Sequence, residues 1–432
     1  MSHQAVSDQS QAPEPHSSPS GPSERTADYS DLSATENKDD AALVLGLNKL
    51  DIRDPSLNHN EVASDIEARA TAAYDKPPGE SEQGTATGEP ITEEDRIFAH
   101  ERQVVSQYLL ENVAEFRELS EIRLKGWNNP EGDRYFERQR HIADNPDDNT
   151  SKIFLGMMQR VGAKMQDATG VFTLSSKRPS MLALGCAPGG FVETALKVNR
   201  DVQIIGITLP AKDNGVECLV KHRRLRLIEA DVTMLGADLG ITEADIPPEH
   251  PDAKNFLPRQ IRPRQQFDLV TCEGGVLRTH QVASYREHRE AARLKTSQLA
   301  IALARVKPGG SMVVLMHRAE SRNSLYLFHI FSKFGKVCLF KPDFEHQHRS
   351  SFYMIVTNIQ SQDEAAQRAV KQWTSEWKAA TFCTEEEYRE WLRSNTVDLN
   401  ELLEEFGKEW VELSREVWNL QIKGLQRKSF TK

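Results

Sequence analysis

An alternation of short apolar runs with helical patterns between residues 180 and 359 restricts the fold of this chain more than any other feature. The runs have the length of β-strands, and amphipathic segments of helical period lie between most of them. This order is typical of an α/β fold with a doubly wound, mostly parallel sheet. We predict seven strands, at residues 181–185, 202–208, 225–229, 267–272, 311–316, 336–340 and 352–358.

The connections between these strands carry further information. A loop at residues 341–351 is all that separates the last two strands, so we expect an antiparallel hairpin at the end of the sheet. The helix before the fifth strand is expected to stop at Pro308 and the two glycines after it. A Pro-rich insertion at residues 235–266 separates the third and fourth strands, and loops of this length are usually functional or disordered.

The N-terminal part of the chain divides into two segments. Residues 1–95 are rich in Ser, Pro, Glu, Asp, Gly and Thr, which predicts a disordered tail. Its apolar stretch at residues 41–50 is either a short docking helix or, as we prefer, an incidental patch. Residues 96–179 are predicted to be a helical lead-in, with a second helix near residues 151–165. Its first amphipathic helix is expected to bury a stripe of Val104, Tyr108, Val113, Phe116, Leu119 and Ile122.

Residues 361–432 predict a C-terminal helical extension after the strand domain of residues 180–360. Its apolar residues alternate at spacings of four and three, which is a heptad seam. Two interpretations are open: a helix packed on its own domain, which we prefer, and a homodimeric coiled coil, which Gly407 inside the seam disfavours. The seam consists of Leu399, Leu403, Phe406, Trp410, Leu413, Val417 and Leu420.

Composition excludes several classes of protein. The net charge of −10 argues against a uniformly basic nucleic-acid binder, although basic residues cluster in the middle of the chain. The five cysteines are scattered without a Cys-x-x-Cys pair, which argues against structural zinc and a disulfide framework and favours a reducing compartment. No apolar run approaches the length of a membrane-spanning helix, and the N-terminus has no signal or transit pattern. We therefore expect a cytoplasmic or nuclear protein without a membrane partner.

The strongest local signal is a glycine-rich turn between the first strand and the next helix. The glycines let the backbone pass close beneath a ligand, and the free N–H groups at the start of the helix favour an anionic group there. Pro188 is atypical of the dinucleotide-binding turn, which the loop does not match. The loop consists of Gly185, Cys186, Ala187, Pro188, Gly189, Gly190 and Phe191.

The string Leu184-Gly-Cys-Ala-Pro-Gly-Gly-Phe191 resembles the first motif of the FtsJ-like ribose 2′-O-methyltransferases, Leu-Gly-x-Ala-Pro-Gly-Gly followed by an aromatic residue. Residues 204–210, 229–232, 267–274 and 306–314 are similar to the ends of that family's second to fifth strands. The resemblance implies a Rossmann-like methyltransferase sheet whose cofactor is S-adenosylmethionine. It also implies transfer of a methyl group to an oxygen acceptor, an RNA ribose 2′-hydroxyl, and an otherwise parallel sheet with one late reversed strand.

Two further cofactor-binding residues are implied by the resemblance. Thr208 occupies the position at which the family often has an acidic residue that binds the ribose hydroxyls, and a hydroxyl binds them less strongly than a carboxylate. Asp231 occupies the position of the residue that accepts a hydrogen bond from the adenine amino group. The alternative for Asp231 is a helix cap or turn former.

The catalytic Lys-Asp-Lys-Glu tetrad of the family is altered in this chain. Its aspartate corresponds to Glu273, its second lysine to Leu315 and its glutamate to Ser351. Its first lysine corresponds to Leu155 in the strict register, with Lys152 one turn away.

His317 lies two residues beyond Leu315 on the same face of the predicted strand, so it is a candidate replacement base. The alternative is a histidine on the rim of the sheet without a special role.

Basic residues gather after the strands whose carboxyl ends form the ligand crevice, which suits RNA phosphates; solvated helix faces explain such charges equally well. They are Arg278, His280, Arg286, Arg289, Arg293, Lys295, Arg318, Arg322, His346, His348 and Arg349. Two alternatives to an RNA methyltransferase stay open: a methyltransferase of small molecules, for which proximity can suffice, and a non-catalytic descendant that binds the cofactor or a partner.

Overall fold

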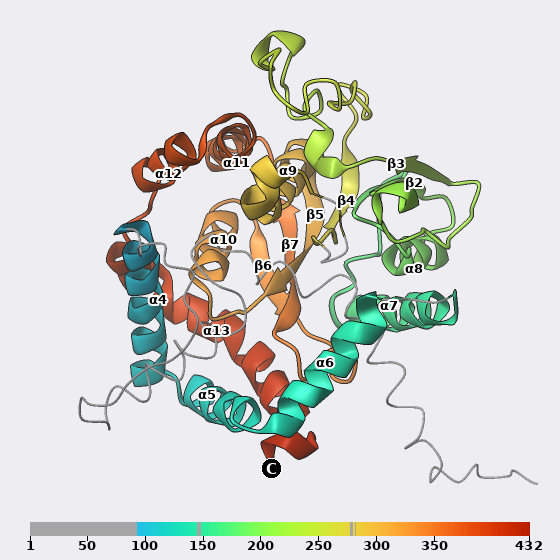
Figure 1. The fold of residues 1–432 in the computed structure, drawn as a ribbon. Coiled ribbons are helices and arrows are strands. Elements are labelled where there is room, and N and C mark those ends of the chain that lie inside the picture. The colour runs from blue at the N-terminus through green and yellow to red at the C-terminus, as the bar shows by residue number, and fades with distance from the viewer. Residues whose placement is uncertain (1–92, 145–147, 277–279, 281) are drawn as a thin grey trace, which may run out of the picture. The chain divides into compact units, whose positions relative to one another are not determined.

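The computed structural model describes residues 93–144, 148–276, 280 and 282–432 (Figure 1). All of them fall within one of the two units into which the chain divides, Asn37–Lys432; the other unit, Met1–Glu36, lies outside the described residues. Residues 1–92, which make up nearly all of the predicted tail and include the stretch at 41–50, also lie outside them.

A seven-stranded sheet in the order β3-β2-β1-β4-β5-β7-β6 forms the centre of the described unit. Strands β1 to β5 are parallel, and β7 runs antiparallel to both β5 and β6. The predicted doubly wound α/β sheet with a terminal antiparallel hairpin is confirmed. Its strands are β1 Ser180–Leu184, β2 Gln203–Thr208, β3 Leu225–Glu229, β4 Phe267–Cys272, β5 Val306–His317, β6 Lys336–Phe340 and β7 Ser351–Ile359.

Strand β5 begins five residues earlier than predicted. Helix α9 (Glu290–Arg305) ends at Arg305, and Val306 already pairs with Phe267 of β4, so the predicted stop at Pro308 is wrong. Val306 is β-branched and fully buried, which favours the strand conformation. The strand accommodates Pro308 because the register between β4 and β5 shifts in this region.

Helices cover both faces of the sheet (Figure 1). Alternate strand residues such as Met181, Ala183 and Val313 share a core with α7 (Asp148–Thr169) and α8 (Gly190–Val198). Their neighbours, such as Leu182 and Val314, face α9 and α10 (Arg322–Ser332). The period-two alternation of the strands therefore decides which face carries which helices. Helix α7 contains the predicted segment 151–165 and buries Phe154, Met157, Met158 and Val161.

The lead-in differs from the single amphipathic helix that we predicted. It forms α4 (Glu93–Asn112) and α5 (Ala114–Trp127), which are separated by Val113 in an extended conformation. The Arg117 guanidinium donates to the carbonyls of Leu110 and Glu111 and so satisfies the end of α4. Val113 and the α5 residues of the predicted stripe are buried, whereas Val104 and Tyr108 are only partly buried.

A further helix, α6 (Pro130–Asp144), was not predicted from the sequence. Its residues are mostly polar, so no apolar stripe marks it. Proline at the first helical position and an Asn129 side chain that accepts from the Glu131 N–H are its start signals.

The C-terminal extension consists of α11 (Glu364–Phe382), α12 (Glu385–Ser394), α13 (Leu399–Gln426) and the 3-10 turn η6 (Ser429–Thr431). Helix α13 packs on α5, α10 and β6 of its own chain. Of the heptad seam, Leu413 and Leu420 are partly exposed. These contacts favour a helix that packs on its own domain. The buried seam residues are Leu399, Leu403, Phe406, Trp410 and Val417.

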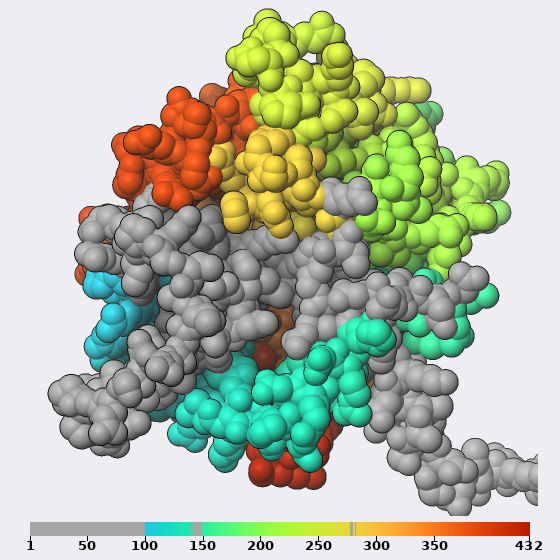
Figure 2. All heavy atoms as spheres, in the orientation of Figure 1, coloured from blue at the N-terminus to red at the C-terminus, as the bar shows by residue number. Residues whose placement is uncertain are grey.

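The insertion at residues 235–266 packs against α11 and contains a short 3-10 turn, η4 (Glu243–Asp245). The Asp238 carboxylate accepts hydrogen bonds from the backbone N–H groups of Gln260 and Ile261, at 2.8 and 3.0 Å. The ring of Phe256 lies edge-to-face on Trp377 of α11, with centroids 6.0 Å apart. Figure 2 shows this segment, in yellow-green, beside the yellow residues that lead into α9.

Within the part of the chain that the structure describes, none of the helices has both the length and the apolar character that crossing a membrane requires.

Candidate methyltransferase site

The glycine-rich turn lies at the carboxyl end of β1, in the centre of the sheet. The N–H of Gly185 donates to the Ile207 carbonyl of β2 at 2.8 Å, and Gly185 has a φ of +71°. A Cβ atom at this position would lie 2.2 Å from the Cα of Gly274. Only glycine therefore allows β1 and the residues after β4 to approach this closely.

The second half of the turn leads directly into α8, and the peptide between Ala187 and Pro188 is cis. Gly189 has a φ of +111° and provides no side-chain cap for the helix, so the first N–H groups of α8 face outward from a positive helix end. A Cβ atom at Gly190 would lie 2.3 Å from the Cβ of Met158, which fixes α8 against α7. This arrangement is suited to an anionic group such as a carboxylate.

Phe191 does not line the site with its ring. The ring is fully buried and contacts Phe172 and Tyr353 at centroid distances of 5.6 and 5.4 Å. Its predicted part in cofactor binding is therefore limited to its backbone, because an aromatic residue one position into a helix that covers a sheet turns toward the core.

Thr208 ends β2, and Asp231 lies two residues beyond the end of the neighbouring strand β3. Thr208 is the last residue of β2 and is 5% exposed, and its carbonyl accepts from the N–H of Ala230 after β3. Asp231 caps the 3-10 turn η3 (Val232–Met234), since its Oδ1 accepts from the Thr233 N–H and hydroxyl, both at 2.8 Å. The alternative capping role is thus present in the structure, and only Oδ2 is left for the predicted adenine contact.

Glu273 directly follows β4, the strand between β1 and β5. Its N–H donates to the Leu184 carbonyl, and its Oε1 accepts from the Thr271 hydroxyl at 2.7 Å. Burial raises the pKa of this carboxyl to about 8, the Thr271 hydrogen bond opposes the shift, and negative charge on Cys218 adds to it. A carboxyl with a pKa in this range can accept a proton under mildly alkaline conditions.

The positions of the altered tetrad share one face of the sheet. Leu315 of β5 pairs with Tyr353 of β7, and His317 pairs with Ser351. Leu315 and Tyr353 contact the α7 and α8 core, so by alternation His317 and Ser351 lie on that face also. Burial, together with the charge of Glu273, raises the pKa of Tyr353, which places the carboxylate near these side chains.

Lys152 lies on an exposed position of α7, six residues before Met158. Because Met158 meets the start of α8, the preceding turns of α7 extend past the strand ends toward the crevice. The role of Lys152 stays a prediction.

The predicted basic rim is wrong for the arginines after β4. Arg286 pairs with Asp252 and Glu290, Arg289 with Glu385, and Arg293 is fully buried against Glu290 and the Thr381 hydroxyl. They hold the insertion and the C-terminal extension to α9, so they are not available to RNA phosphates. Arg278 lies outside the described residues.

The basic residues before β7 are buried as well. His346, His348 and Arg349 are each at most 9% exposed, in a loop whose carbonyls surround the Lys341 ammonium group. Burial and neighbouring positive charges hold the pKa of both histidines well below the usual range, so they are neutral near pH 7.

Two residues that sequence reasoning did not identify shape the site. The Gln298 side chain of α9 accepts from the Gly274 N–H at 2.9 Å and donates to the Gly274 carbonyl at 3.0 Å. These hydrogen bonds fix the position of Gly274, the residue that follows Glu273. Gln298 is a buried polar residue next to the buried Leu299 in α9, and a buried polar side chain needs a hydrogen-bond partner. Its place in this apolar helix is the one feature of the sequence that could have drawn attention to it.

The second residue, Cys218, lies against the glycine-rich turn, and its Sγ is 3.4 Å from the position of a Cβ on Gly189.

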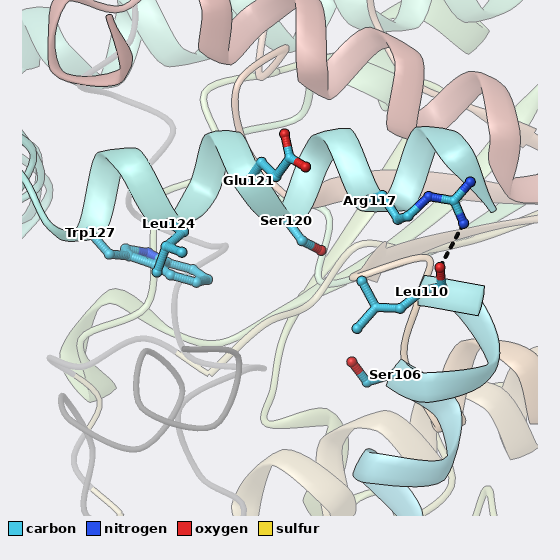
Figure 3. A pocket seen from close by; sticks show the side chains of 7 residues that line it. All are labelled: Ser106, Leu110, Arg117, Ser120, Glu121, Leu124 and Trp127. Carbon is cyan, nitrogen blue, oxygen red and sulfur yellow. Dashed lines mark hydrogen bonds between the residues drawn. The ribbon is translucent and has the colours of Figure 1, made fainter. Parts of the chain in front are cut away.

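A separate groove of about 180 Å³ lies between α4 and α5 (Figure 3). The hydrogen bond from Arg117 to the Leu110 carbonyl crosses its end at 2.6 Å. None of its lining residues belongs to the predicted cofactor or catalytic set. They are Ser106, Leu110, Arg117, Ser120, Glu121, Leu124 and Trp127.

The sheet order, the glycine turn and the uncapped start of α8 together define a Rossmann-like methyltransferase domain. Residues 157–359 match the family model of the FtsJ-like methyltransferases. The predicted class, an S-adenosylmethionine-dependent methyltransferase, is thereby confirmed together with its cofactor. No significant match was found among curated protein sequences.

Solved structures that resemble the chain are distant. A ribosomal RNA methyltransferase from Plasmodium falciparum is 17% identical, with 46% of this chain and 97% of that chain covered and a TM-score of 0.31. The N-methyltransferase NodS from Bradyrhizobium japonicum is 14% identical, with 47% and 97% covered and a TM-score of 0.28. Similarity at this level does not identify an acceptor.

Proposed function

We propose that this chain transfers a methyl group to an oxygen acceptor and that the acceptor is a ribose 2′-hydroxyl of RNA. The observation that carries the proposal is the position of Glu273 directly after β4, where the sequence resemblance puts the family's tetrad aspartate. Thr271 donates to its carboxyl group, and Gln298 accepts from the N–H of the following residue, Gly274. A carboxyl at this place can orient a hydroxyl for in-line attack and take its proton.

The residues around the glycine turn fit S-adenosylmethionine, which supplies an electrophilic methyl group when bound. Gly185 and Gly189 let the backbone form the cradle, since a side chain at either would collide with neighbouring atoms. The free N–H groups of α8 would hold the methionine carboxylate, Thr208 the ribose, and Asp231 Oδ2 the adenine amino group.

Removal of the acceptor proton needs a different group from the family's second lysine, because Leu315 has no basic atom. We assign this role to Glu273, whose pKa of about 8 makes it a stronger base than an exposed carboxylate. His317 on the same face is the second candidate, and Lys152 would add positive charge at the mouth of the crevice.

A specific observation favours a second candidate function, the methylation of a small molecule. The arginines predicted to contact phosphates are buried and paired inside the protein. A small acceptor does not require such a surface, and orientation within the crevice can supply much of the rate enhancement.

The test is an assay with labelled S-adenosylmethionine, in which RNA and small-molecule extracts are offered separately. Digestion of the RNA and mass spectrometry should then show 2′-O-methylnucleosides, and binding to the RNA should weaken steeply with salt. The matched control is Gly189→Leu, whose side chain would meet Val220 at 2.6 Å and should abolish cofactor binding. If the labelled methyl group is found in a small molecule and not in RNA, the second candidate function replaces the first. Cofactor binding without label in either pool would refute both.

A further inference from the structure

Two of the five cysteines meet directly beneath the cofactor loop. Cys186 belongs to the glycine turn and is 1% exposed, and Cys218 lies in the segment after β2 and is 5% exposed. The Sγ of Cys186 lies 2.8 Å from the position of a Cβ on Gly206, and the Sγ of Cys218 lies 3.4 Å from that of Gly189. The two sulfurs therefore occupy the space that these glycines leave open.

The two thiols interact with each other, and the Sγ of Cys218 also lies 3.9 Å from the Val220 carbonyl. The interaction between the thiols lowers the pKa of Cys218 to about 7 and, together with burial, raises that of Cys186 well above its usual range. Burial raises the pKa of each of the other three cysteines, 272, 338 and 383. Cys218 is thus the thiol with the largest thiolate fraction near neutral pH, and it is next to a resolving partner.

The segment that contains Cys218 has no regular secondary structure. Residues 214–222 form neither helix nor strand, and the segment is joined to the loop by a 3.0 Å hydrogen bond from the Leu219 N–H to the Pro188 carbonyl. Val220 contacts Gly189 from the same side. Segments with few backbone hydrogen bonds open at a lower free energy than the strands of a sheet. Such opening gives a small oxidant access to the sulfurs.

We propose that Cys186 and Cys218 are a modification site at which peroxide forms a disulfide bond across the cofactor loop. The Cys218 thiolate attacks one oxygen of hydrogen peroxide, the O–O bond breaks, and hydroxide leaves as water after it takes a proton. Cys186 then attacks the sulfenic sulfur, the S–S bond forms, and a second water leaves. Two thiols are oxidised and one peroxide is reduced to two waters.

The disulfide would tie segment 218–220 to the turn that must receive the cofactor. We expect it to weaken binding of S-adenosylmethionine by about tenfold or more, because the turn can no longer separate from Val220. This consequence rests on the proposed function, whereas formation of the bond requires only that the two thiols are neighbours and that peroxide reaches Cys218.

The experiment treats the reduced full-length chain with hydrogen peroxide and then alkylates the remaining thiols under denaturing conditions. Peptide mass spectrometry should find Cys186 and Cys218 in one cross-linked peptide pair that dithiothreitol releases, with the other cysteines alkylated. Cys218→Ser and Cys186→Ser should each prevent the cross-link. Cys383→Ser, a partly exposed thiol outside the loop, is the matched control and should preserve it.

The outcomes separate the two proposals. A cross-link with loss of S-adenosylmethionine binding, restored by dithiothreitol, supports both the site and its effect. A cross-link in a chain that never binds the cofactor supports the modification site and counts against the proposed function. Oxidation that stops at a single sulfur, or a cross-link that persists in Cys218→Ser, overturns the inference.

Discussion

In the proposed function, methyl transfer depends on the protonation of one carboxyl group, Glu273. Because burial raises its pKa to about 8, we expect the rate of methyl transfer to rise with pH and to level off above that value. Glu273→Gln should lower the rate by about 10²–10⁴-fold and remove this pH dependence. Initial rates between about pH 6 and pH 9, with the transferred label as the readout, test both effects.

The matched control is Glu376→Gln. Glu376 lies on α11, and burial raises its pKa to about 7, but it is not among the residues of the crevice. An unchanged pH profile is expected for this variant.

Stability gives a second readout for Glu273. The neutral form is favoured in the folded chain, so the stability that it contributes is present at low pH and is lost as pH rises from its ordinary pKa toward about 8. Glu273→Gln should reduce that loss. If Glu273→Gln keeps the pH profile of the wild type, another group titrates in this range, and His317 is the next candidate.

The ammonium group of Lys341 organises the loop between β6 and β7. Its three donors reach the carbonyls of His346, Arg349 and Ser351 at 3.2, 2.6 and 2.7 Å. Lys341→Met would leave three carbonyls without this partner and should lower the free energy of unfolding by about 3 kcal/mol. Denaturant titration measures the change, and Lys336→Met, an exposed lysine on the same chain segment, should change it by less than about 0.5 kcal/mol. Equal effects in the two variants would contradict the assigned role.

At the scale of single elements, the helix α13 is held by its own chain. Trp410 is fully buried, and its Nε1 donates to the Ala319 carbonyl at 2.8 Å. Trp410→Ala should lower the free energy of unfolding by about 3–5 kcal/mol, whereas the partly exposed Leu413→Ala should cost about 1 kcal/mol or less. Sedimentation should give a monomeric mass for the wild type and both variants. A dimeric wild type that dissociates in Trp410→Ala would restore the coiled-coil interpretation.

The elements that sequence could predict are those whose signal is local. Strands β3, β4 and β6 have the predicted bounds, because each is a short segment rich in aliphatic or aromatic residues between polar or turn-forming segments. The break at Val113 was missed because the apolar spacing continues across it, and the cap from Arg117 comes from the following helix. The start of β5 was missed because Pro308 and two glycines usually stop a strand.

The candidate site shows the same division between local and distant information. The glycine turn was predictable because the backbone conformation that it requires is specific to glycine at Gly185 and Gly189. The burial of Arg289 and Arg293 was not, because their partners Glu385 and Thr381 are about 90 residues away, at 96 and 88 positions. Charge along a sequence does not reveal whether its partner is solvent or another segment.

At the scale of the whole described unit, the insertion and the C-terminal extension behave as parts of the methyltransferase domain. Trp377 of α11 donates from Nε1 to the Thr233 carbonyl at 3.1 Å, within the 3-10 turn that Asp231 caps. His250 of the insertion bonds the Thr381 carbonyl at 2.9 Å. The added segments therefore support the edge of the sheet at which the predicted cofactor residues Thr208 and Asp231 lie.

This arrangement predicts an energetic coupling between segments that are more than 100 residues apart. Phe256 and Trp377 pack edge-to-face at 6.0 Å, so a double-mutant cycle of Phe256→Ala and Trp377→Leu should give a coupling of about 0.5–1.5 kcal/mol in the free energy of unfolding. The control cycle pairs Phe256→Ala with Leu413→Ala on α13, which should be additive within about 0.5 kcal/mol. The Phe256 ring joins the insertion to α11. Additive effects in both cycles would therefore mean that the insertion packs independently of the C-terminal extension. A coupling confined to the first cycle would mean that the insertion and α11 stabilise each other through this ring contact.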